Sequence, residues 1–422
     1  MCREQNGVRA AAPKTLDAGS EGLTPAQRQA LVQIWAVLPQ ARLVGGVVRD
    51  LLIGRPVADV DIATPETPEQ VQETLTAAGI KTVPTGLAHG TVTAAIASAP
   101  YEITTLRRDL ETDGRHAVVS WTTDWREDAA RRDFTINAMS RSRDGALYDY
   151  FGGQADLARG LVRFVGDAGT RIEEDALRIL RFFRFQGRYG VGQPDADAMQ
   201  AIMQRVELIT RLSVERVWSE LQRILTGPNA DGLVTMMAQA GVLSVILPEG
   251  FTLGRFTGLV QVGAPADAVL RLAALLEKGR EGAAQRLKLS RADTAFLLAV
   301  SHGPVPEADA SDATLRRFLA DEPARHLVGR TWLRQATLLA EAQANTEATS
   351  LPDAQAFAAL RKRLEAMPRP VFPVAGRDIL AAGHAPGPAV GQVLAHLRNW
   401  WMAEGCTPSR EACLAQLQHG FR

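Results

Sequence analysis

The chain has 422 residues, no formal net charge and 46% hydrophobic residues, which is enough for two to four domains with a substantial core. The balanced charge excludes a uniformly basic nucleic-acid-binding protein, and no apolar run approaches the ~20 residues of a membrane span. No lysine lies between Lys81 and Lys278, so a phosphate loop or kinase strand that depends on lysine is excluded there. Any phosphate in this region must be bound by arginine, metal or backbone.

The N-terminus and the cysteines indicate the compartment. Residues 1–23 carry no apolar signal segment, so we expect a flexible N-terminus and a cytoplasmic protein without membrane association. Cys2, Cys406 and Cys413 match neither a disulfide framework nor a zinc pattern. We expect these cysteines to be structural.

Residues 24–165 are predicted to form a small mixed α/β domain. The segment 24–38 has the pattern of an amphipathic helix, with Pro25 favourable in its first turn. A second helix is expected at 67–78. Short β-rich runs surround the helices at 43–44, 57–63, 81–83, 91–97 and 102–106, and a hairpin is expected across Asp144-Gly145. Hairpins dominate the second half, which favours a small mixed sheet over a doubly wound one.

A glycine-led helix start is followed by two aspartates. Gly45-Gly46 opens a predicted short helix that ends near Gly54; glycine lets the backbone approach a ligand, and the helix start presents free N–H groups to phosphate. Asp59 and Asp61 are two apart on a predicted strand and therefore share a face. A phosphate-binding backbone with paired carboxylates suits nucleotidyl transfer with divalent metal. The alternative is a β-α-β turn whose aspartates are only exposed at a strand end.

Two further features lie between residues 101 and 120. Glu102 is on a predicted strand, where a third carboxylate could deprotonate or orient an attacking hydroxyl. A single strand glutamate is more often a plain surface residue. Residues 107–120 are polar around Gly114 and predict an exposed, flexible loop, which fits a passive connector as well as a moving part of a site.

Residues 131–139 combine two guanidiniums, a carboxylate and an amide. Arg131, Arg132, Asp133 and Asn137 supply the bidentate donors and acceptors that suit a triphosphate and a ribose. The alternative is a salt-bridged helix end at the surface.

From residue 166 onward the pattern becomes helical, with a neck predicted at 166–250 and a body and tail at 251–422. Helices are expected at 173–189, 195–205, 214–225 and 230–241, with Ser213 as an N-cap. On the first of these, a polar stripe on an otherwise apolar helix is formed by Asp175, Arg178, Arg181 and Arg184. A solvated face is the ordinary meaning of such a stripe. Because apolar residues cover the other sides, we expect an interior polar cleft, where Asp and Arg could read a base edge.

Together these strings resemble the class II tRNA nucleotidyltransferase and poly(A) polymerase family, and in particular the CCA-adding enzymes. The resemblance rests on four ordered motifs within about residues 41–225: Gly45-Gly46-Val47-Val48-Arg49-Asp50 with Asp59-Val60-Asp61, then Arg131 to Ala138, Glu174 to Arg181 and Leu212 to Val217. It implies an α+β fold, in which a small mixed nucleotidyltransferase head of the polymerase-β-like type precedes all-helical neck, body and tail domains. It also implies template-independent addition of C, C and A to the 3′ end of tRNA from CTP and ATP, with release of pyrophosphate.

Carried over residue by residue, the resemblance implies that Asp59 and Asp61 hold Mg²⁺ and that Glu102 is the third catalytic carboxylate. Asp175 and Arg178 would act as a protein template for C or A, and the loop around Gly114 resembles the family's flexible loop, which is linked to the switch from C to A addition. The implied partner is the acceptor arm and 3′ end of tRNA, read by shape, and no protein partner is evident. The implied nucleotide contacts are Gly45, Gly46, Arg49, Arg132, Asp133, Asn137, Asp175, Arg178, Arg181 and Arg184.

Three alternatives stay open: a poly(A) polymerase acting on RNA 3′ ends, a CC-only or A-only tRNA nucleotidyltransferase, and a catalytically dead RNA-binding protein. Residues 83–91 contain no Arg or Lys, whereas the poly(A) polymerase branch carries a basic signature there, which favours the tRNA branch. The intact pair Asp59 and Asp61, with Arg132 and Asp175, argues against the dead protein. No histidine is followed by aspartate, so an appended metal phosphohydrolase activity is not expected.

Overall fold

The computed structural model describes residues 22–86, 90–112, 117–345 and 352–419. Contacts divide the chain into two compact units. The first contains the residues up to Asn229 together with Met236–Ile246, and the second contains Ala230–Thr235 together with Leu247–Arg422. The finer division into head, neck and body stays a prediction.

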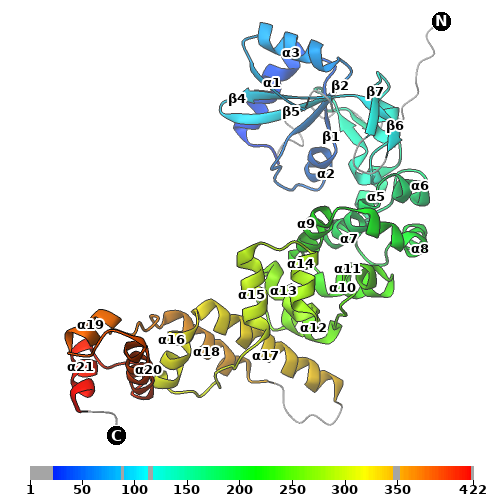
Figure 1. The fold of residues 1–422 in the computed structure, drawn as a ribbon. Helices are drawn as coiled ribbons and strands as arrows, with labels where there is room; N and C mark the ends of the chain where they lie inside the picture. The colour runs from blue at the N-terminus through cyan, green and yellow to red at the C-terminus, as the bar shows by residue number, and fades with distance from the viewer. Residues whose placement is uncertain (1–21, 87–89, 113–116, 346–351, 420–422) are drawn as a thin grey trace, which may run out of the picture. The chain divides into compact units, whose positions relative to one another are not determined.

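The first unit begins with a seven-stranded mixed sheet (Figure 1). The parallel pair β2–β5 places Asp61 in register with Glu102, while the other neighbouring strands are antiparallel. Two carboxylates that are far apart in sequence thereby meet at one end of this pair. In spatial order the strands are β3 (Lys81–Gly86), β4 (Thr91–Ile96), β5 (Ala99–Thr105), β2 (Asp61–Thr64), β1 (Arg42–Val44), β8 (Met139–Arg141) and β9 (Leu147–Asp149).

Two helices with closely similar starts share a core with this sheet. α1 (Pro25–Val37) and α3 (Pro68–Ala77) each begin with a threonine N-cap, a proline in the first turn and a glutamine that completes a capping box. Buried residues such as Trp35 of α1 and Leu75 of α3 belong to the same apolar cluster as Ile103 of β5. Both helices are confirmed as the sequence predicts them.

The segment between α2 (Gly46–Leu52) and β2 is irregular. The helix ends just before Gly54, which has φ +68°, as predicted. The predicted strand 57–63 is wrong in its first half, because β2 starts only at Asp61. The preceding residues bond to the N-terminal segment instead: the Val57 N–H donates to the carbonyl of Gly22 at 2.9 Å.

Two hairpins follow in the chain. Residues 107–120, expected as a flexible loop, instead contain β6 (Arg107–Thr112) and most of β7 (Ala117–Trp121), which form a separate two-stranded sheet. A two-stranded ribbon needs no face committed to a core, so its sequence lacks the apolar alternation that reveals a strand. The connection that contains Gly114 lies outside the described residues. The hairpin across Asp144-Gly145 is confirmed by the antiparallel pairing of β8 with β9.

Helices complete the first unit and are joined to the sheet by aromatic packing. The ring centroid of Phe134 lies 5.0 Å from that of Phe164 and 5.1 Å from that of Phe185 on α7. This packing fixes the strand-end segment 131–139 against α7. The helices are α4 (Trp125–Ala130), α5 (Gly153–Arg159), α6 (Ala168–Glu174), α7 (Leu177–Tyr189), α8 (Ala196–Arg205), α9 (Val214–Thr226), the end of α10 (Ala230–Gln239) from Met236 onward, and α11 (Val242–Ile246), with 3₁₀ turns at Thr135–Asn137 and Val206–Arg211.

The single helix predicted over 173–189 is wrong, because α6 and α7 are separated at Asp175. This residue has extended backbone angles of φ −152° and ψ 103°. Its carboxylate accepts a hydrogen bond from the Leu177 N–H at 3.1 Å. A side chain that bonds locally to the backbone in this way competes with helix continuation, and here it ends one helix and starts the next.

The second unit consists of helices. Cys406 and Cys413 are buried free thiols in an apolar cluster with Trp401, in agreement with the structural role predicted for them, whereas Cys2 lies outside the described residues. Across the described ranges, no helix is long and apolar enough to cross a membrane. The helices are α12 (Leu253–Gln261), α13 (Ala268–Leu275), α14 (Arg280–Arg286), α15 (Arg291–Ser301), α16 (Asp312–Asp321), α17 (Ala324–Ala344), α18 (Ala354–Ala366), α19 (Gly376–Ala381), α20 (Pro388–Ala403) and α21 (Arg410–His419).

Candidate active site

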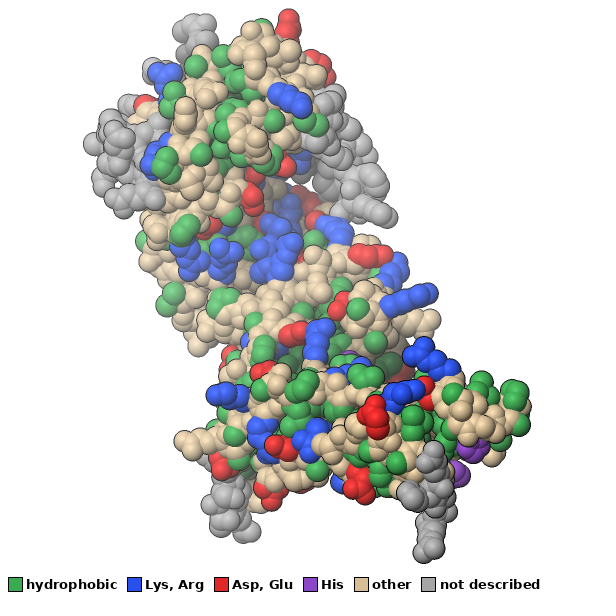
Figure 2. All heavy atoms as spheres, turned by 90° about the vertical axis from the view of Figure 1, so that its left-hand side faces the viewer, with side chains coloured by type: hydrophobic (Ala, Val, Ile, Leu, Met, Phe, Trp, Pro, Cys, Tyr) green, Lys and Arg blue, Asp and Glu red, His purple; other side chains and the backbone are tan. Residues whose placement is uncertain are grey.

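A cavity of about 610 Å³ in the first unit collects most of the predicted site residues. Figure 2 faces a hollow of this unit in which Lys and Arg side chains gather. The predicted residues that line the cavity are Gly45, Gly46, Arg49, Asp61, Arg132, Asp133, Asn137, Asp175, Arg178 and Arg181. Three residues named in the sequence only as parts of their motifs also line it: Arg131, Leu177 and Arg216. The residues that sequence reasoning missed are Arg107 and Phe185.

The glycine pair forms one wall through its backbone. Gly45 precedes α2 with φ +68° and ψ −126°, a conformation that residues with a side chain rarely adopt. A Cβ atom at Gly45 would lie 2.9 Å from Nη1 of Arg132, whereas one at Gly46 would meet Arg49 Nη2 at 3.4 Å. The fold therefore requires glycine at position 45. At position 46 the absence of a side chain leaves the backbone open to the cavity.

The predicted catalytic carboxylates lie around the start of β2, and of these only Asp61 lines this cavity. Asp61 is the first residue of β2, but Asp59 lies in the bend before it, so the two are not alternate residues of one strand as predicted. A second hollow of about 460 Å³ is lined by Asp59, Asp61 and Glu102, together with Gln27 and Tyr101. Asp61 lines both hollows and thus connects the carboxylates to the arginines.

The surroundings of Asp61 concentrate negative charge. Partial loss of water around its carboxylate raises the pKa of Asp61, and the charges of Glu102 and Asp59 raise it further against the opposing effect of Arg132. Among the described residues, no three His, Cys, Asp or Glu side chains are close enough to form a complete metal cage. Any cation held here would need oxygen ligands from outside the protein as well.

Arg49 on α2 is a buried arginine fixed from three directions. Its Nη1 donates to Oδ1 of Asn137, and Nε and Nη2 donate to the carboxylate of Asp50 at 3.0 and 3.1 Å. Its guanidinium carbon lies 4.2 Å from the ring centroid of Tyr189 on α7. The Tyr189 hydroxyl donates to Asp50 at 3.0 Å, which closes the network. Arg49 and Asp50, which both belong to the first motif, thus hold α2 against α7.

A buried carboxylate that the sequence analysis did not single out orients the two motif arginines. Asp128 on α4 accepts from Arg131 Nε and Nη2 at 2.9 and 2.7 Å and from Arg132 Nη2 at 3.1 Å. Burial alone would raise the pKa of Asp128, but the two guanidiniums hold it below its ordinary value. The alternative of a salt-bridged helix end is correct for these contacts, yet both arginines also line the cavity.

Asp133 ties the same motif to α7. It is buried and accepts from Arg181 Nε at 2.9 Å, Asn137 Nδ2 at 3.0 Å and the Phe134 N–H at 2.8 Å. Burial would raise the pKa of Asp133, but the charge of Arg181 and these hydrogen bonds lower it. The same ion pair raises the pKa of Arg181 despite its burial. Asp133 and Arg181 thus form an ion pair at the cavity wall, in which each charge favours the charged form of the other.

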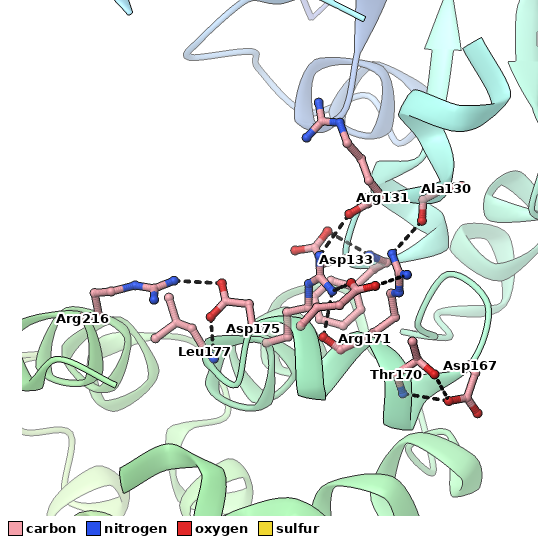
Figure 3. A network of polar contacts seen from close by, with 12 residues as sticks. Ala130, Arg131, Asp133, Asp167, Thr170, Arg171, Asp175, Leu177 and Arg216 are labelled. Carbon is pink, nitrogen blue, oxygen red and sulfur yellow. Dashed lines mark hydrogen bonds and ion pairs between the residues drawn. The ribbon is translucent and has the colours of Figure 1, made fainter. Parts of the chain in front are cut away.

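Asp175 faces α9 from the break between α6 and α7 (Figure 3). One of its oxygens bonds to the Leu177 N–H, and the other accepts from Arg216 Nη2 of α9 at 2.8 Å. Arg178 donates to Glu174, to the carbonyl of Arg171 at 2.7 Å and to the carbonyl of Arg131 at 3.0 Å. Its guanidinium thus joins the helix to the arginine motif while it lines the cavity.

Arg184 does not join this group. Its Nε donates to the buried Glu220 of α9 at 2.6 Å, and it does not belong to the residues that line the described cavity. Two more turns of α7 carry it away from the break at Asp175. The predicted stripe is therefore divided between a helix junction, the cavity wall and a helix–helix contact.

Comparisons with known proteins agree with this geometry. A family profile described as "Poly A polymerase head domain" matches residues 41–163, and one described as "Probable RNA and SrmB- binding site of polymerase A" matches residues 193–252. A mitochondrial CCA tRNA nucleotidyltransferase 1 of Danio rerio is 36% identical over 90% of this chain and 87% of its own length. A CCA-adding enzyme of Geobacillus stearothermophilus is 41% identical over 49% of this chain and 50% of its own length.

A solved structure extends the likeness to the fold. A crystal structure of the Bacillus stearothermophilus CCA-adding enzyme in complex with CTP matches 94% of this chain and 98% of its own, with a TM-score of 0.73 and 27% identity. The match covers the mixed sheet and the helices that follow it, which agrees with the α+β architecture predicted from the sequence.

Proposed function

The chain belongs to the family of CCA tRNA nucleotidyltransferases, and from this premise we propose that it adds C, C and A to the 3′ end of tRNA from CTP and ATP, releasing pyrophosphate without a nucleic-acid template. The observation that carries the proposal is that one cavity is lined by the carboxylate of Asp61 and by arginines of all four motifs. A carboxylate and several guanidiniums that line one cavity suit a nucleoside triphosphate bound with a metal ion.

The phosphates are assigned to the glycine and arginine wall. The cavity is lined by the backbone of Gly46, which no side chain covers, and by the guanidiniums of Arg49 and Arg132. These groups can bind phosphate without a lysine. Asp128 holds Arg132 and Asp133 holds Arg181, so these donors are oriented before the nucleotide arrives. Preorganised donors of this kind stabilise charge without reorganising during the reaction.

The carboxylates are assigned to Mg²⁺. Enzymes of this family use a divalent metal, and we assign its protein ligands to Asp59 and Asp61, because carboxylate oxygens are the ligands that Mg²⁺ prefers. The charge concentrated on Asp61 by Glu102 and Asp59 supports this assignment. When bound, Mg²⁺ would neutralise phosphate charge and favour attack by the tRNA 3′ hydroxyl. Glu102 would orient that hydroxyl or take its proton.

Base choice is assigned to the junction of α6 and α7. Asp175 supplies acceptors, and Arg178 and Arg181 supply donors at the cavity wall, so together they can pair with the edges of C and A. Arg184 was predicted as a nucleotide contact, but its bond to Glu220 favours a role in holding α7 against α9. The acceptor arm of tRNA is assigned to the helical part of the chain, in line with the RNA-binding profile at 193–252.

The test is an incorporation assay with tRNA that lacks its 3′ end, supplied with CTP and ATP, and with product length resolved on a gel. Growth that stops after three residues is the expected result. A long A tail would identify a poly(A) polymerase, growth that stops at CC or requires a pre-added CC would identify a partial enzyme, and no extension would overturn the proposal. Omission of Mg²⁺ should abolish extension. The cytoplasmic location stays a prediction, since the Danio rerio relative is described as mitochondrial.

A further inference from the structure

The loop that carries Asp59 is held by a residue of α1. Gln27 Nε2 donates to the carbonyl of Val57 at 3.1 Å and to the carbonyl of Ala58 at 3.4 Å, directly before Asp59. Gln27 also lines the hollow that Asp59, Asp61 and Glu102 share. Gln27 lies outside the four family motifs and stands more than thirty positions before the aspartates.

The same loop is held a second time by the segment that precedes α1. The Val57 N–H donates to the Gly22 carbonyl at 2.9 Å, and a Cβ atom at Gly22 would lie 2.6 Å from the carbonyl oxygen of Arg55. Val57 is buried, as is Leu23. The start of α1 and the loop before β2 are therefore packed backbone to backbone.

Asp59 depends on these contacts for its position. It lies outside β2, so no strand ladder fixes it, and its own side chain is exposed. Gln27 is on a rigid element, since α1 buries Leu31, Ile34 and Trp35 in the main core. A loop residue attached to a rigid helix can keep a fixed distance to Asp61.

We propose that Gln27 is a positioning residue for the metal-binding carboxylates: its amide nitrogen fixes the Val57–Ala58 backbone and thereby sets Asp59 beside Asp61. The inference rests on the proposed function, in which Asp59 and Asp61 hold Mg²⁺. The two ends of the amide have separate tasks. Oε1 accepts from the Thr24 N–H at 2.8 Å and caps α1, while Nε2 holds the loop.

This separation allows the loop contact to be removed without removing the helix cap. Gln27→Glu keeps an oxygen for the Thr24 N–H, because glutamate serves in a capping box as well as glutamine does, but it cannot donate to the two carbonyls. The added negative charge would by itself strengthen cation binding. The charge change alone would lower the Mg²⁺ concentration that the enzyme needs. A higher Mg²⁺ requirement in Gln27→Glu would therefore come from loss of the loop contact.

Two control variants separate the remaining explanations. Gln70→Glu makes the same chemical change at the capping box of α3, where Gln70 is exposed and accepts from the Thr67 N–H at 3.0 Å. Thr24→Ala removes the other half of the α1 capping box and leaves Gln27 Nε2 on its carbonyls. It should lower stability without changing the metal requirement.

The measurements are the Mg²⁺ concentration for half-maximal CTP incorporation, Mn²⁺ binding by electron paramagnetic resonance with a non-hydrolysable CTP analogue, tRNA affinity and the thermal midpoint. For Gln27→Glu we expect about tenfold weaker Mg²⁺ activation and Mn²⁺ binding, since the loss of the hydrogen bonds to the Val57 and Ala58 carbonyls frees the loop. Its tRNA affinity should match that of Gln70→Glu, and its thermal midpoint should be somewhat lower because it loses the two loop hydrogen bonds.

Equal metal dependence in Gln27→Glu and Gln70→Glu would overturn the inference, and so would a metal defect of the same size in Thr24→Ala. If Gln27→Glu does not fold, Gln27→Met, which also lacks the donor, is compared with Thr24→Ala. An equal Mg²⁺ requirement in these two variants would overturn the inference too. If the native enzyme needs no divalent metal or adds no nucleotides, the proposed function fails, which is a different result.

Discussion

Replacing Gly46 by alanine separates the effect of this glycine on stability from its proposed role in nucleotide binding. A Cβ atom at this position would meet Arg49 Nη2 at 3.4 Å, an ordinary contact, and the residue opens α2 in a helical conformation. Alanine in place of a helical glycine stabilises by roughly 0.5–1 kcal/mol. The free energy of unfolding should therefore stay unchanged or rise slightly. Nucleotide binding should weaken, because the methyl group occupies the space that a phosphate needs beside the backbone N–H.

The size of the binding loss follows from the contact that the methyl group prevents. A hydrogen bond to a charged group contributes about 1.5–3 kcal/mol, which corresponds to roughly 10- to 150-fold in kcat/KM for CTP and ATP. Gly45→Ala is the matched reference, because its φ of +68° and the 2.9 Å approach to Arg132 make it costly to the fold itself, on the order of 1–3 kcal/mol.

The assay combines steady-state CTP and ATP incorporation with thermal unfolding of both variants and the native protein. A Gly46→Ala enzyme that is at least as stable as the native protein but binds nucleotide much more weakly fits the reasoning. If nucleotide affinity and kcat/KM stay within twofold of native, Gly46 does not border the phosphates. The proposal that the phosphates bind at the backbone of the glycine pair would then be wrong.

Three further changes test other parts of the site. Asp59→Ala or Asp61→Ala should abolish incorporation of both C and A while tRNA affinity stays close to native; near-native turnover with Mg²⁺ would contradict the metal assignment. Asp175→Ala, which also releases Arg216, should lower the preference for CTP and ATP over UTP and GTP by about 1–3 kcal/mol, whereas a uniform loss of rate would mean that Asp175 only supports α9. A rigid, proline-containing replacement of residues 113–116 should spare C addition and suppress the terminal A in single-turnover assays, and equal losses at both steps would refute a gating role.

Features with local chemical signals could be predicted from the sequence. The start of α1 is legible because Thr24, Pro25 and Gln27 together form a capping box with proline in the first turn. The turn at Asp144-Gly145 is legible because glycine there permits φ +82°. The order of the motifs was enough for the family and hence the α+β architecture.

Features that depend on distant partners could not be predicted. The break at Asp175 results from a local backbone bond and from Arg216, which reaches it from another helix. Asp128 stands three and four residues before the arginines that it holds, so its partners were visible but its burial was not. The β6–β7 ribbon forms a sheet of its own, and its sequence carries no apolar alternation that would have revealed it.

The parallel pairing of β2 with β5 has a consequence for the order of folding. β3, β4 and β5 pair as sequential antiparallel neighbours and can form early, whereas the ladder that joins Asp61 to Glu102 closes a loop through all of α3, β3 and β4. Contacts of such long sequence separation form slowly. We therefore expect Asp61 and Glu102 to meet late in the folding of this sheet, after the β3–β4–β5 meander has formed.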